Sequence, residues 1–168
     1  MTQGMRSAIT IAVLSLLLVV AAIWGWSAAT KPLPGKVDTP ICVDQVIAEG
    51  EKVFPQDVTV SVYNAGSRDG LAGLVMQELT EAGFHQGNGG NAAPTVRVSK
   101  VQIWTEDPTS PDVRLVASRL GKKVQIESRT GPGAGVTVVV GDKFGETRKG
   151  RKAVVAEADV EICSPPVG

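Results

Sequence analysis

The chain has 168 residues, enough for one ordinary domain and an additional segment. Its 17 Lys and Arg residues balance its 17 Asp and Glu residues, so the formal net charge at pH 7 is +0. A balanced charge provides no overall field to attract nucleic acid, and we expect no nucleic-acid partner.

The first candidate element is an uncharged, apolar segment at residues 7–30. As an α-helix it would be about 36 Å long, and the hydrocarbon core of a membrane is about 30 Å thick. Arg6 precedes it, and Trp24 and Trp26 lie near its far end, where indole rings favour the membrane interface. We therefore predict a short cytoplasmic tail at residues 1–6, a transmembrane anchor at residues 7–30 and an extracytoplasmic domain beyond the anchor.

A cleaved signal peptide is the alternative interpretation of this segment, with the small residues 27–29 as its cleavage site. The apolar run is longer than the usual core of about 7–15 residues, and tryptophans crowd the proposed site, so an uncleaved anchor is favoured. The flanking charges leave the orientation open, because Arg6 precedes the segment while Lys31 and Lys36 follow it. A tail of six residues cannot hold a domain, however, so the folded part must follow the anchor.

Residues 31–40 hold three prolines and a glycine, which predicts a semi-rigid stalk, and the extracytoplasmic domain is then expected at residues 41–168. Both cysteines of the chain, Cys42 and Cys163, belong to this domain. In an oxidising compartment such a pair predicts one disulfide, and two buried free thiols are the alternative. A metal site would need more ligands than two thiols and the lone His85.

The first predicted elements of the domain are a strand at residues 58–63 and a helix that follows it. Valines alternate strictly along the strand, which is typical of a half-buried position in a sheet. From Leu71 onwards apolar residues recur with the spacing of one helix face, and Gly83 stands where a left-handed C-terminal residue is expected. Ser67 or Asp69 is expected to cap the start of this helix.

The next region has no single periodicity. Residues 84–95 are rich in glycine and asparagine, which predicts a mobile loop with room for one short strand at its start. In residues 95–104 the apolar alternation changes phase at Ser99 and Lys100. This change indicates either a β-bulge or a turn between two short strands.

A second helix is predicted at residues 110–121, because Ser is in the N-cap position, Pro in the first helical position and Gly at the end. Short strands follow at residues 124–126 and 136–140, and an alternating segment at residues 158–163 predicts a last, edge strand. The order β-α-β-β-α-β-β predicts an α/β (α+β) fold. We expect a two-layer sandwich, in which a small mixed sheet carries two helices on one face.

The glycine-rich turn before the first helix lies where a phosphate-binding loop would be expected. The spacing of Gly66, Gly70 and Gly73 fits neither the P-loop nor the dinucleotide fingerprint. We expect Gly66 to permit a tight turn, and the other two glycines to let the helix approach the sheet. Arg68 and Asp69 at the turn are candidate contacts for an anionic ligand, although capping alone accounts for Asp69.

No arrangement of residues in the sequence indicates catalysis. The one histidine, His85, adjoins the predicted mobile loop, where a catalytic base could not be held rigidly. The acidic pairs Glu106–Asp107 and Glu78–Glu81 are typical of loop and solvent-facing helix charges. We therefore predict no enzymatic activity, no catalytic residues and no cofactor or metal; a hydrolase or transferase with an unrecognised site is the alternative.

Two further features are candidates for ligand contacts. Trp104 is expected on the sheet face opposite the core, where it would either stack on a sugar ring or cover that face. The segment 143–152 is basic, and it either holds an anionic wall polymer or forms a solvated turn. Its basic residues are Lys143, Arg148, Lys149, Arg151 and Lys152.

Several motifs together carry a family resemblance: V-T-V-S-V-Y followed by N-A, then G-L-A at the helix start, L-T-E-A-G-F at its end, and V-T-V-V-V-G-D late in the chain. With these motifs, residues 58–144 resemble the LytR C-terminal domain family and would form the core of the domain. The family pattern places a strand after the G-F, where this chain has G-N-G-G-N.

The resemblance implies a non-enzymatic, membrane-anchored actinobacterial protein that supports cell envelope integrity and is associated with virulence. The family has no assigned catalytic residues to carry over. The implied partners are a cell-wall polymer, either peptidoglycan or an attached glycopolymer, or an envelope-assembly protein.

Overall fold

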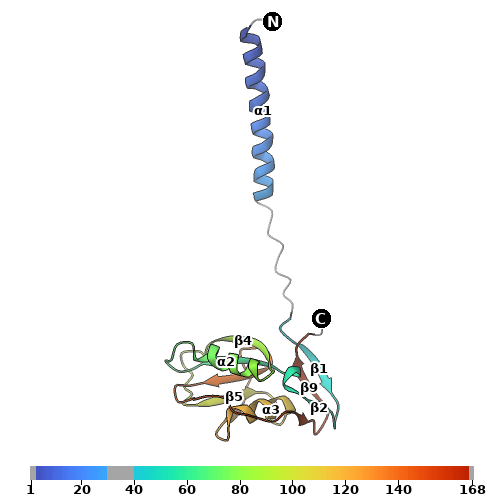
Figure 1. The fold of residues 1–168 in the computed structure, drawn as a ribbon, viewed down its shortest axis with the longest axis vertical. Coiled ribbons are helices and arrows are strands. Elements are labelled where there is room, and N and C mark those ends of the chain that lie inside the picture. The colour runs from blue at the N-terminus through green and yellow to red at the C-terminus, as the bar shows by residue number, and fades with distance from the viewer. Residues whose placement is uncertain (1–2, 30–39, 167–168) are drawn as a thin grey trace. The chain divides into compact units, whose positions relative to one another are not determined.

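A computed structural model of the chain describes residues 3–29 and 40–166. The chain divides into two compact units, residues 1–39 and residues 40–168. The first unit contains helix α1 (Gln3–Ala29), which is long and apolar enough to cross a membrane (Figure 1). The predicted stalk lies outside the described residues, apart from its last proline.

The second unit holds all the other elements labelled in Figure 1. Its helices are α2 (Leu71–Glu81) and α3 (Pro111–Leu120), and one 3-10 turn, η1, spans Pro55–Asp57. Its strands are β1 (Val43–Ile47), β2 (Lys52–Val53), β3 (Thr59–Asn64), β4 (His85–Asn91), β5 (Val101–Thr105), β6 (Gln125–Ser128), β7 (Val136–Val140), β8 (Val154–Val155) and β9 (Val160–Ser164).

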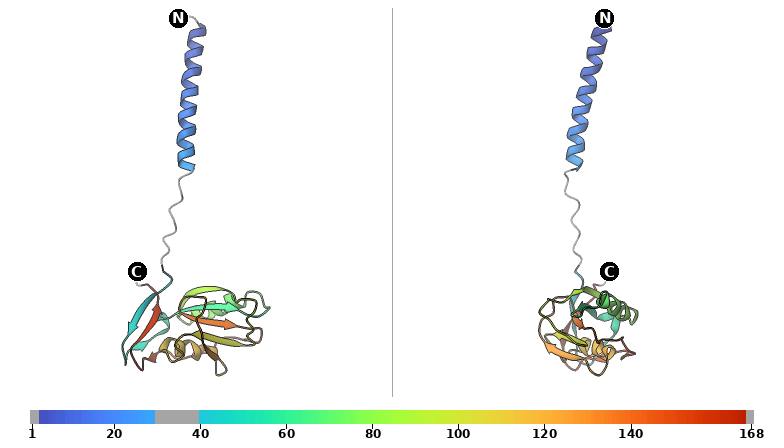
Figure 2. Two further views of the ribbon diagram at one scale, coloured as in Figure 1. Left: turned by 180° about the vertical axis from the view of Figure 1, so that it is seen from behind. Right: turned by 90° about the vertical axis from the view of Figure 1, so that its left-hand side faces the viewer.

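Five of these strands form the main sheet, in the order β4-β3-β7-β5-β6. Strand β5 runs antiparallel to β7, and the other neighbouring pairs are parallel. Two short antiparallel ladders, β1-β9 and β2-β8, complete the unit, and the β1-β9 ladder lies at one end of it beside the main sheet (Figures 1 and 2). Along the chain the main sheet and its helices follow the order β3-α2-β4-β5-α3-β6-β7, which confirms the predicted order of elements.

One hydrophobic core lies between the main sheet and both helices. Alternate residues of β3, β7 and β5, such as Val62, Val138 and Ile103, are fully buried on one face of the sheet. They belong to the same cluster as Val75 of α2 and Val116 of α3. Because successive strand residues point to opposite faces, both helices must cover the same side. The predicted two-layer sandwich with two helices on one face is confirmed.

The opposite face of the sheet is covered by a glycine-rich loop and a small apolar cluster. The loop at residues 131–135 lies so close to the strands that an added Cβ at Gly131 would be 2.0 Å from Oγ1 of Thr137. A residue with a side chain cannot approach a sheet in this way. Beside the loop, Trp104 and Val139 pack together in the apolar cluster.

The structure corrects the prediction for residues 84–95: the strand allowed at the start of this segment is present, but it fills most of the predicted mobile loop. Seven of these residues form β4, which pairs in parallel with β3. The hydroxyl of Ser61 on β3 accepts a hydrogen bond from the amide of Asn88 at 2.9 Å, and an added Cβ at Gly87 would lie 2.5 Å from that hydroxyl. The absence of a side chain at Gly87 therefore serves close strand packing rather than mobility.

Neither alternative predicted for residues 95–104 occurs. Residues 95–100, all of them described, form no strand, and the single strand β5 follows them. Val98 is nevertheless buried, because it packs with Trp104 on the second face of the sheet. Its apolar character thus reflects packing of an irregular segment and not strand alternation.

The start of α2 also differs from the prediction. Its N-cap is Gly70, with a φ of 74°, and no side chain caps the helix, so the expected cap by Ser67 or Asp69 is wrong. An added Cβ at Gly70 or Gly73 would meet no atom within 4 Å, so neither glycine serves a close approach to the sheet. At the other end Gly83 has a φ of 98°, which confirms the expected left-handed residue.

Cys42 and Cys163 form a disulfide, as predicted, with their Cα atoms 5.4 Å apart. The β1-β9 ladder brings them together, since Asp44 pairs with Cys163 in its register. The last strand, predicted at residues 158–163, is β9. A covalent bond therefore joins the residue just before the first strand of the second unit to its last strand.

Candidate functional site

A cleft of about 540 Å³ opens in the second unit among three segments that are distant in the sequence. They are the start of β5, the residues that follow α3, and the segment at residues 143–148. Val101, Leu120 and Phe144 supply its buried apolar lining. The core of the domain thus forms part of the cleft wall, while the rest of the wall is polar and charged.

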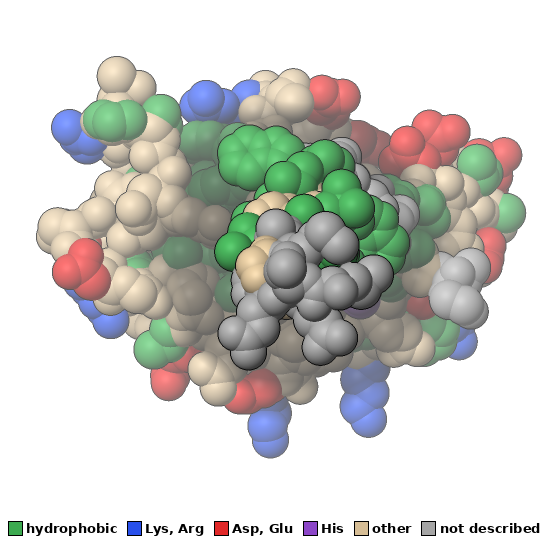
Figure 3. All heavy atoms as spheres, turned by 90° about the horizontal axis from the view of Figure 1, so that it is seen from above, with side chains coloured by type: hydrophobic (Ala, Val, Ile, Leu, Met, Phe, Trp, Pro, Cys, Tyr) green, Lys and Arg blue, Asp and Glu red, His purple; other side chains and the backbone are tan. Residues whose placement is uncertain are grey.

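The charged side chains of the cleft are mostly of one sign. Five are cationic and one is anionic: Lys100, Lys122, Lys123, Lys143 and Arg148, against Glu146. All six residues are exposed. Over the face shown in Figure 3, by contrast, acidic and basic side chains are interspersed.

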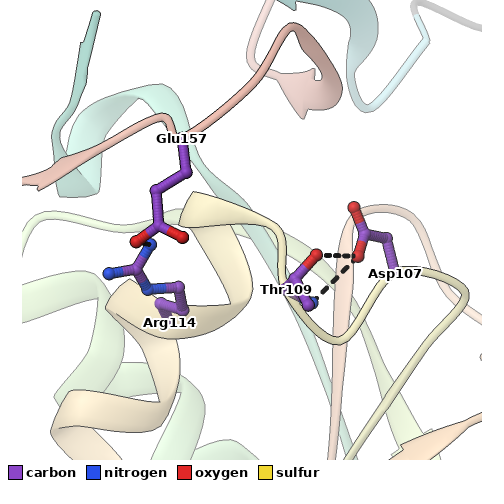
Figure 4. A network of polar contacts seen from close by, with 4 residues as sticks. All are labelled: Asp107, Thr109, Arg114 and Glu157. Carbon is purple, nitrogen blue, oxygen red and sulfur yellow. Dashed lines mark hydrogen bonds and ion pairs between the residues drawn. The ribbon is translucent and has the colours of Figure 1, made fainter. Parts of the chain in front are cut away.

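None of the five cations of the cleft forms an ion pair within the described part of the chain. The ion pair found there, between Arg114 and Glu157 at 2.6 Å, ties α3 to the segment before β9 and lies outside the cleft (Figure 4). Like charges repel one another within the Debye length, which is about 8 Å at physiological ionic strength. An anion that enters the cleft would therefore relieve repulsion among its cations.

The segment at residues 143–148 contains no helix or strand, yet contacts from both helices hold it in place. The amide of Thr147 donates to Oε2 of Glu78 on α2 at 2.8 Å. The amide of Arg148 donates to the backbone oxygen of Arg119 at the end of α3 at 2.7 Å. The basic segment is therefore a fixed wall of the cleft and not only a solvated turn.

The basic residues predicted as ligand contacts fall into two groups. Lys143 and Arg148 line the cleft, whereas Lys149, Arg151 and Lys152 do not. The sequence analysis missed the other three cations of the cleft. Two of these, at residues 122 and 123, come just after the C-cap of α3. The helix dipole favours positive charge at this position, so these two cations could have been predicted from the sequence.

The glycine-rich turn before α2 already holds an anion that belongs to the chain. Oδ1 of Asp142 accepts hydrogen bonds from the amides of Ser67 at 2.7 Å and Arg68 at 3.1 Å. These bonds, above all the one from Ser67, hold the pKa of the Asp142 carboxyl below its ordinary range. The guanidinium of Arg68 donates to the backbone oxygen of Phe144 at 3.1 Å, while Asp69 is exposed. The amides of Ser67 and Arg68 and the Arg68 side chain thus contact the start of the basic segment, and a ligand contact by Arg68 or Asp69 stays a prediction.

Trp104 lies on the sheet face opposite the core, as predicted, and is only 4% exposed. Its indole N–H donates to Oε1 of Gln102 at 3.1 Å, and the guanidinium of Arg129 lies 3.9 Å from the ring centroid. A sugar ring could stack on the indole only after Arg129 had moved. The observed arrangement favours the interpretation that Trp104 covers the sheet face.

The acidic residues of the α3 region have structural partners. Oδ1 of Asp107 accepts hydrogen bonds from the hydroxyl and the amide of Thr109, at 2.6 and 2.9 Å, which lower the pKa of Asp107 (Figure 4). Asp112 is buried, and burial raises the pKa of its carboxyl, although Ser110 and the amide of Val113 bond to it. Within the described residues no group of three or more His, Cys, Asp or Glu side chains is placed to hold a metal ion.

The family model of the LytR cell envelope-related transcriptional attenuator matches residues 57–144, which is just over half of the chain. The chain belongs to this family. The resemblance inferred from the sequence motifs is therefore confirmed. The matched region runs from η1 to Phe144, so it includes both helices, the main sheet and four of the five cations of the cleft.

Similarity to individual proteins is limited. A search of curated proteins finds no match. Among solved structures, the soluble domain of a conserved hypothetical secreted protein from Mycobacterium marinum is 22% identical, over 60% of this chain and 76% of that chain, with a TM-score of 0.43.

Proposed function

We propose that this LytR C-terminal family member is a non-enzymatic, single-pass membrane protein whose extracytoplasmic domain supports cell envelope integrity by binding an anionic envelope polymer. The basic cleft carries this proposal, because five cations face one carboxylate there and no described partner neutralises them. The family description, which names the cell envelope, supports the cellular setting. Helix α1 supports attachment to the membrane, and the Cys42–Cys163 disulfide supports an oxidising compartment.

Binding fits the cleft better than catalysis does. Among the described residues that line it, none supplies a hydroxyl, thiol or imidazole group, and Glu146 is the one carboxylate. Nucleophilic catalysis needs a nucleophile within hydrogen-bond reach of a base. His85, which would be the obvious base, belongs to β4 and does not line the cleft. Lysine amines can also act as nucleophiles, but no ion pair joins a lysine of the cleft to Glu146 within the described residues, so the cleft supports the enzyme alternative less well than it supports binding.

The alternative occupant of the cleft is an acidic surface of an envelope-assembly protein. The same charge pattern would attract such a surface, and long-range attraction would again fall with ionic strength. A polymer is favoured because the cleft is a hollow with a charged rim and not a broad flat face.

Complementation of depleted cells tests the proposal. The cleft variant carries Lys100→Gln, Lys122→Gln and Lys123→Gln, and the control variant carries Lys149→Gln, Arg151→Gln and Lys152→Gln. Each removes three positive charges from exposed side chains, but only the first set lines the cleft.

Depletion of the protein is expected to sensitise cells to detergents and to wall-active drugs. Wild type and the control variant should restore resistance, and the cleft variant should not, at equal protein levels. Full rescue by the cleft variant would overturn the proposal. Loss of rescue in a His85→Ala variant, with the cleft variant active, would favour the enzyme alternative.

A further inference from the structure

The side chains that line the basic cleft recognise charge and little else. Of the described residues in its wall, none carries a hydroxyl, an amide or an indole that could bond to sugar hydroxyls. Phe144 is aromatic, but it is only 6% exposed and belongs to the core cluster, so it offers no open ring for stacking. The ligand must therefore be held mainly through its negative charge.

Four of the five cations are lysines, and this composition favours one kind of anion. A lysine ammonium is a compact point charge with three donors, whereas the planar fork of arginine matches paired oxygens, those of a carboxylate and those of a phosphate alike. Lysines therefore bind an anion mainly through the amount of charge that it carries, as they do when they bind phosphate, and not through a matched pair of oxygens. The single arginine, Arg148, lies with its guanidinium against the end of α3, since an added Cβ at Gly121 would be 3.4 Å from its Nε.

The amount of charge in the cleft points in the same direction. Five cations against one carboxylate leave the cleft strongly positive. A carboxylate brings one negative charge, while a terminal phosphate brings about 1.5 to 2 at pH 7 together with three acceptor oxygens. The lysines also come from three separate segments, so they surround a ligand instead of forming a row along one edge.

We infer that the cleft is a phosphate site: the polymer bound under the proposed function carries phosphate groups, either terminal or closely spaced along its chain. This inference rests on the proposed function and adds the chemical class of the ligand. Lys100, Lys122, Lys123 and Lys143 contact the phosphate oxygens, and Arg148 forms the far wall.

Two small anions of similar charge separate phosphate from carboxylate. The full chain in nanodiscs of neutral lipid is titrated with pyrophosphate and with citrate at equal ionic strength, and the affinity is measured by calorimetry. We expect pyrophosphate to bind at least about tenfold more tightly than citrate, which corresponds to about 1.4 kcal/mol. The cleft variant should weaken pyrophosphate binding about tenfold or more, and the control variant about twofold at most.

The polymer is then tested by competition for isolated wall layers. Poly(glycerol phosphate) should displace the chain from the walls at lower concentration than polygalacturonate, a carboxylate polymer of similar charge spacing. Equal or better displacement by polygalacturonate, or equal affinity for citrate and pyrophosphate, would overturn the phosphate inference. The proposed function would survive that result if the cleft variant still lost wall binding.

A lipid headgroup is the other source of the same chemistry. Nanodiscs that contain phosphatidic acid test it, because a headgroup seated in the cleft would block pyrophosphate. If those discs block pyrophosphate while poly(glycerol phosphate) cannot compete, the assignment to a polymer is overturned. If all anions bind the cleft and control variants equally, the phosphate inference and the proposed function both fail.

Discussion

The carboxylate of Asp142 accepts a hydrogen bond from the amide of Ser67 at 2.7 Å, across 75 positions of sequence. The amide donor belongs to the glycine-rich turn before α2, and Gly66 of that turn is pressed so closely to Asp142 that an added Cβ would lie 2.4 Å from Oδ1. Backbone amides at a turn are suited to bind anions, and here the anion is a side chain of the same chain. The contact also fixes the start of the basic segment, since Asp142 directly precedes Lys143.

Asp142→Asn is expected to weaken the acid dependence of stability. The Ser67 bonds hold the pKa of Asp142 below its ordinary value of 3.8. A carboxyl with a lower pKa in the folded than in the unfolded state stabilises the fold above the unfolded pKa, and this contribution disappears as pH falls through the folded pKa. The wild-type Tm should therefore drop below pH 3.8 more steeply than the Tm of the variant.

Asp69→Asn is the matched control, because Asp69 is an exposed carboxylate near the same turn. Its acid dependence should follow that of the wild type. If Asp142→Asn and Asp69→Asn gave equal acid slopes, the hydrogen bonds from the turn would not have the assigned effect.

Two glycine substitutions should change stability in opposite directions. Gly131→Ala places a Cβ 2.0 Å from Oγ1 of buried Thr137, so it should lower the free energy of unfolding by about 1–3 kcal/mol. Gly73→Ala lies within α2 with no atom near the added Cβ, so it should raise that free energy by about 0.5–1 kcal/mol. Urea denaturation measures both. A Gly131→Ala variant as stable as the wild type would show that the loop does not pack against the sheet as described.

Removing the disulfide should destabilise the second unit. Replacement of Cys42 and Cys163 together by serine removes the covalent link at one end of the β1-β9 ladder, and a loss of about 2–5 kcal/mol is expected. Mass spectrometry of the non-reduced protein should show the two cysteine peptides joined. Alkylation of both thiols in the native protein, with no fall in Tm on reduction, would contradict the assignment.

Arg129→Ala should uncover Trp104. Because the guanidinium lies over the indole, its removal should increase quenching of Trp104 fluorescence by acrylamide and shift the emission to longer wavelength. The measurement needs a background in which Trp24 and Trp26 are replaced by phenylalanine. Arg97→Ala is the control, since this side chain lines the same surface without stacking on the ring. Equal quenching in both variants would contradict a covering role for Arg129.

The parts of the fold that the sequence predicted are those with local signals. Strict valine alternation marked β3, and the helical spacing from Leu71 marked α2. Strand β4 has no such signal, because its residues are Gly, Asn, Gln and His, which are not typical of strands. Its position depends on Asn88, whose amide donates to the hydroxyl of Ser61 and whose Oδ1 accepts from the amide of Ala134 at 2.9 Å. Contacts between residues so distant in the sequence leave no local sequence pattern.

The candidate site was predictable only in part for the same reason. The basic segment was visible because its five cations lie within ten residues of sequence, at positions 143–152. The fold places the start of β5 and the end of α3 beside the basic segment. Only this arrangement brings Lys100, Lys122 and Lys123 into the same cleft as Lys143 and Arg148. The sequence thus indicated positive charge, and the topology determines which charges share a cleft.

Co-sedimentation of the full chain with isolated cell-wall layers tests the central claim most directly. The wild type, the cleft variant and the control variant are compared in detergent micelles over a range of salt concentrations. Salt-sensitive binding that is lost in the cleft variant and kept in the control variant is the predicted result, since both variants lose the same charge and differ only in its place. Equal binding by the two variants, or binding that salt does not affect, would contradict the claim that the basic cleft holds an anionic envelope polymer.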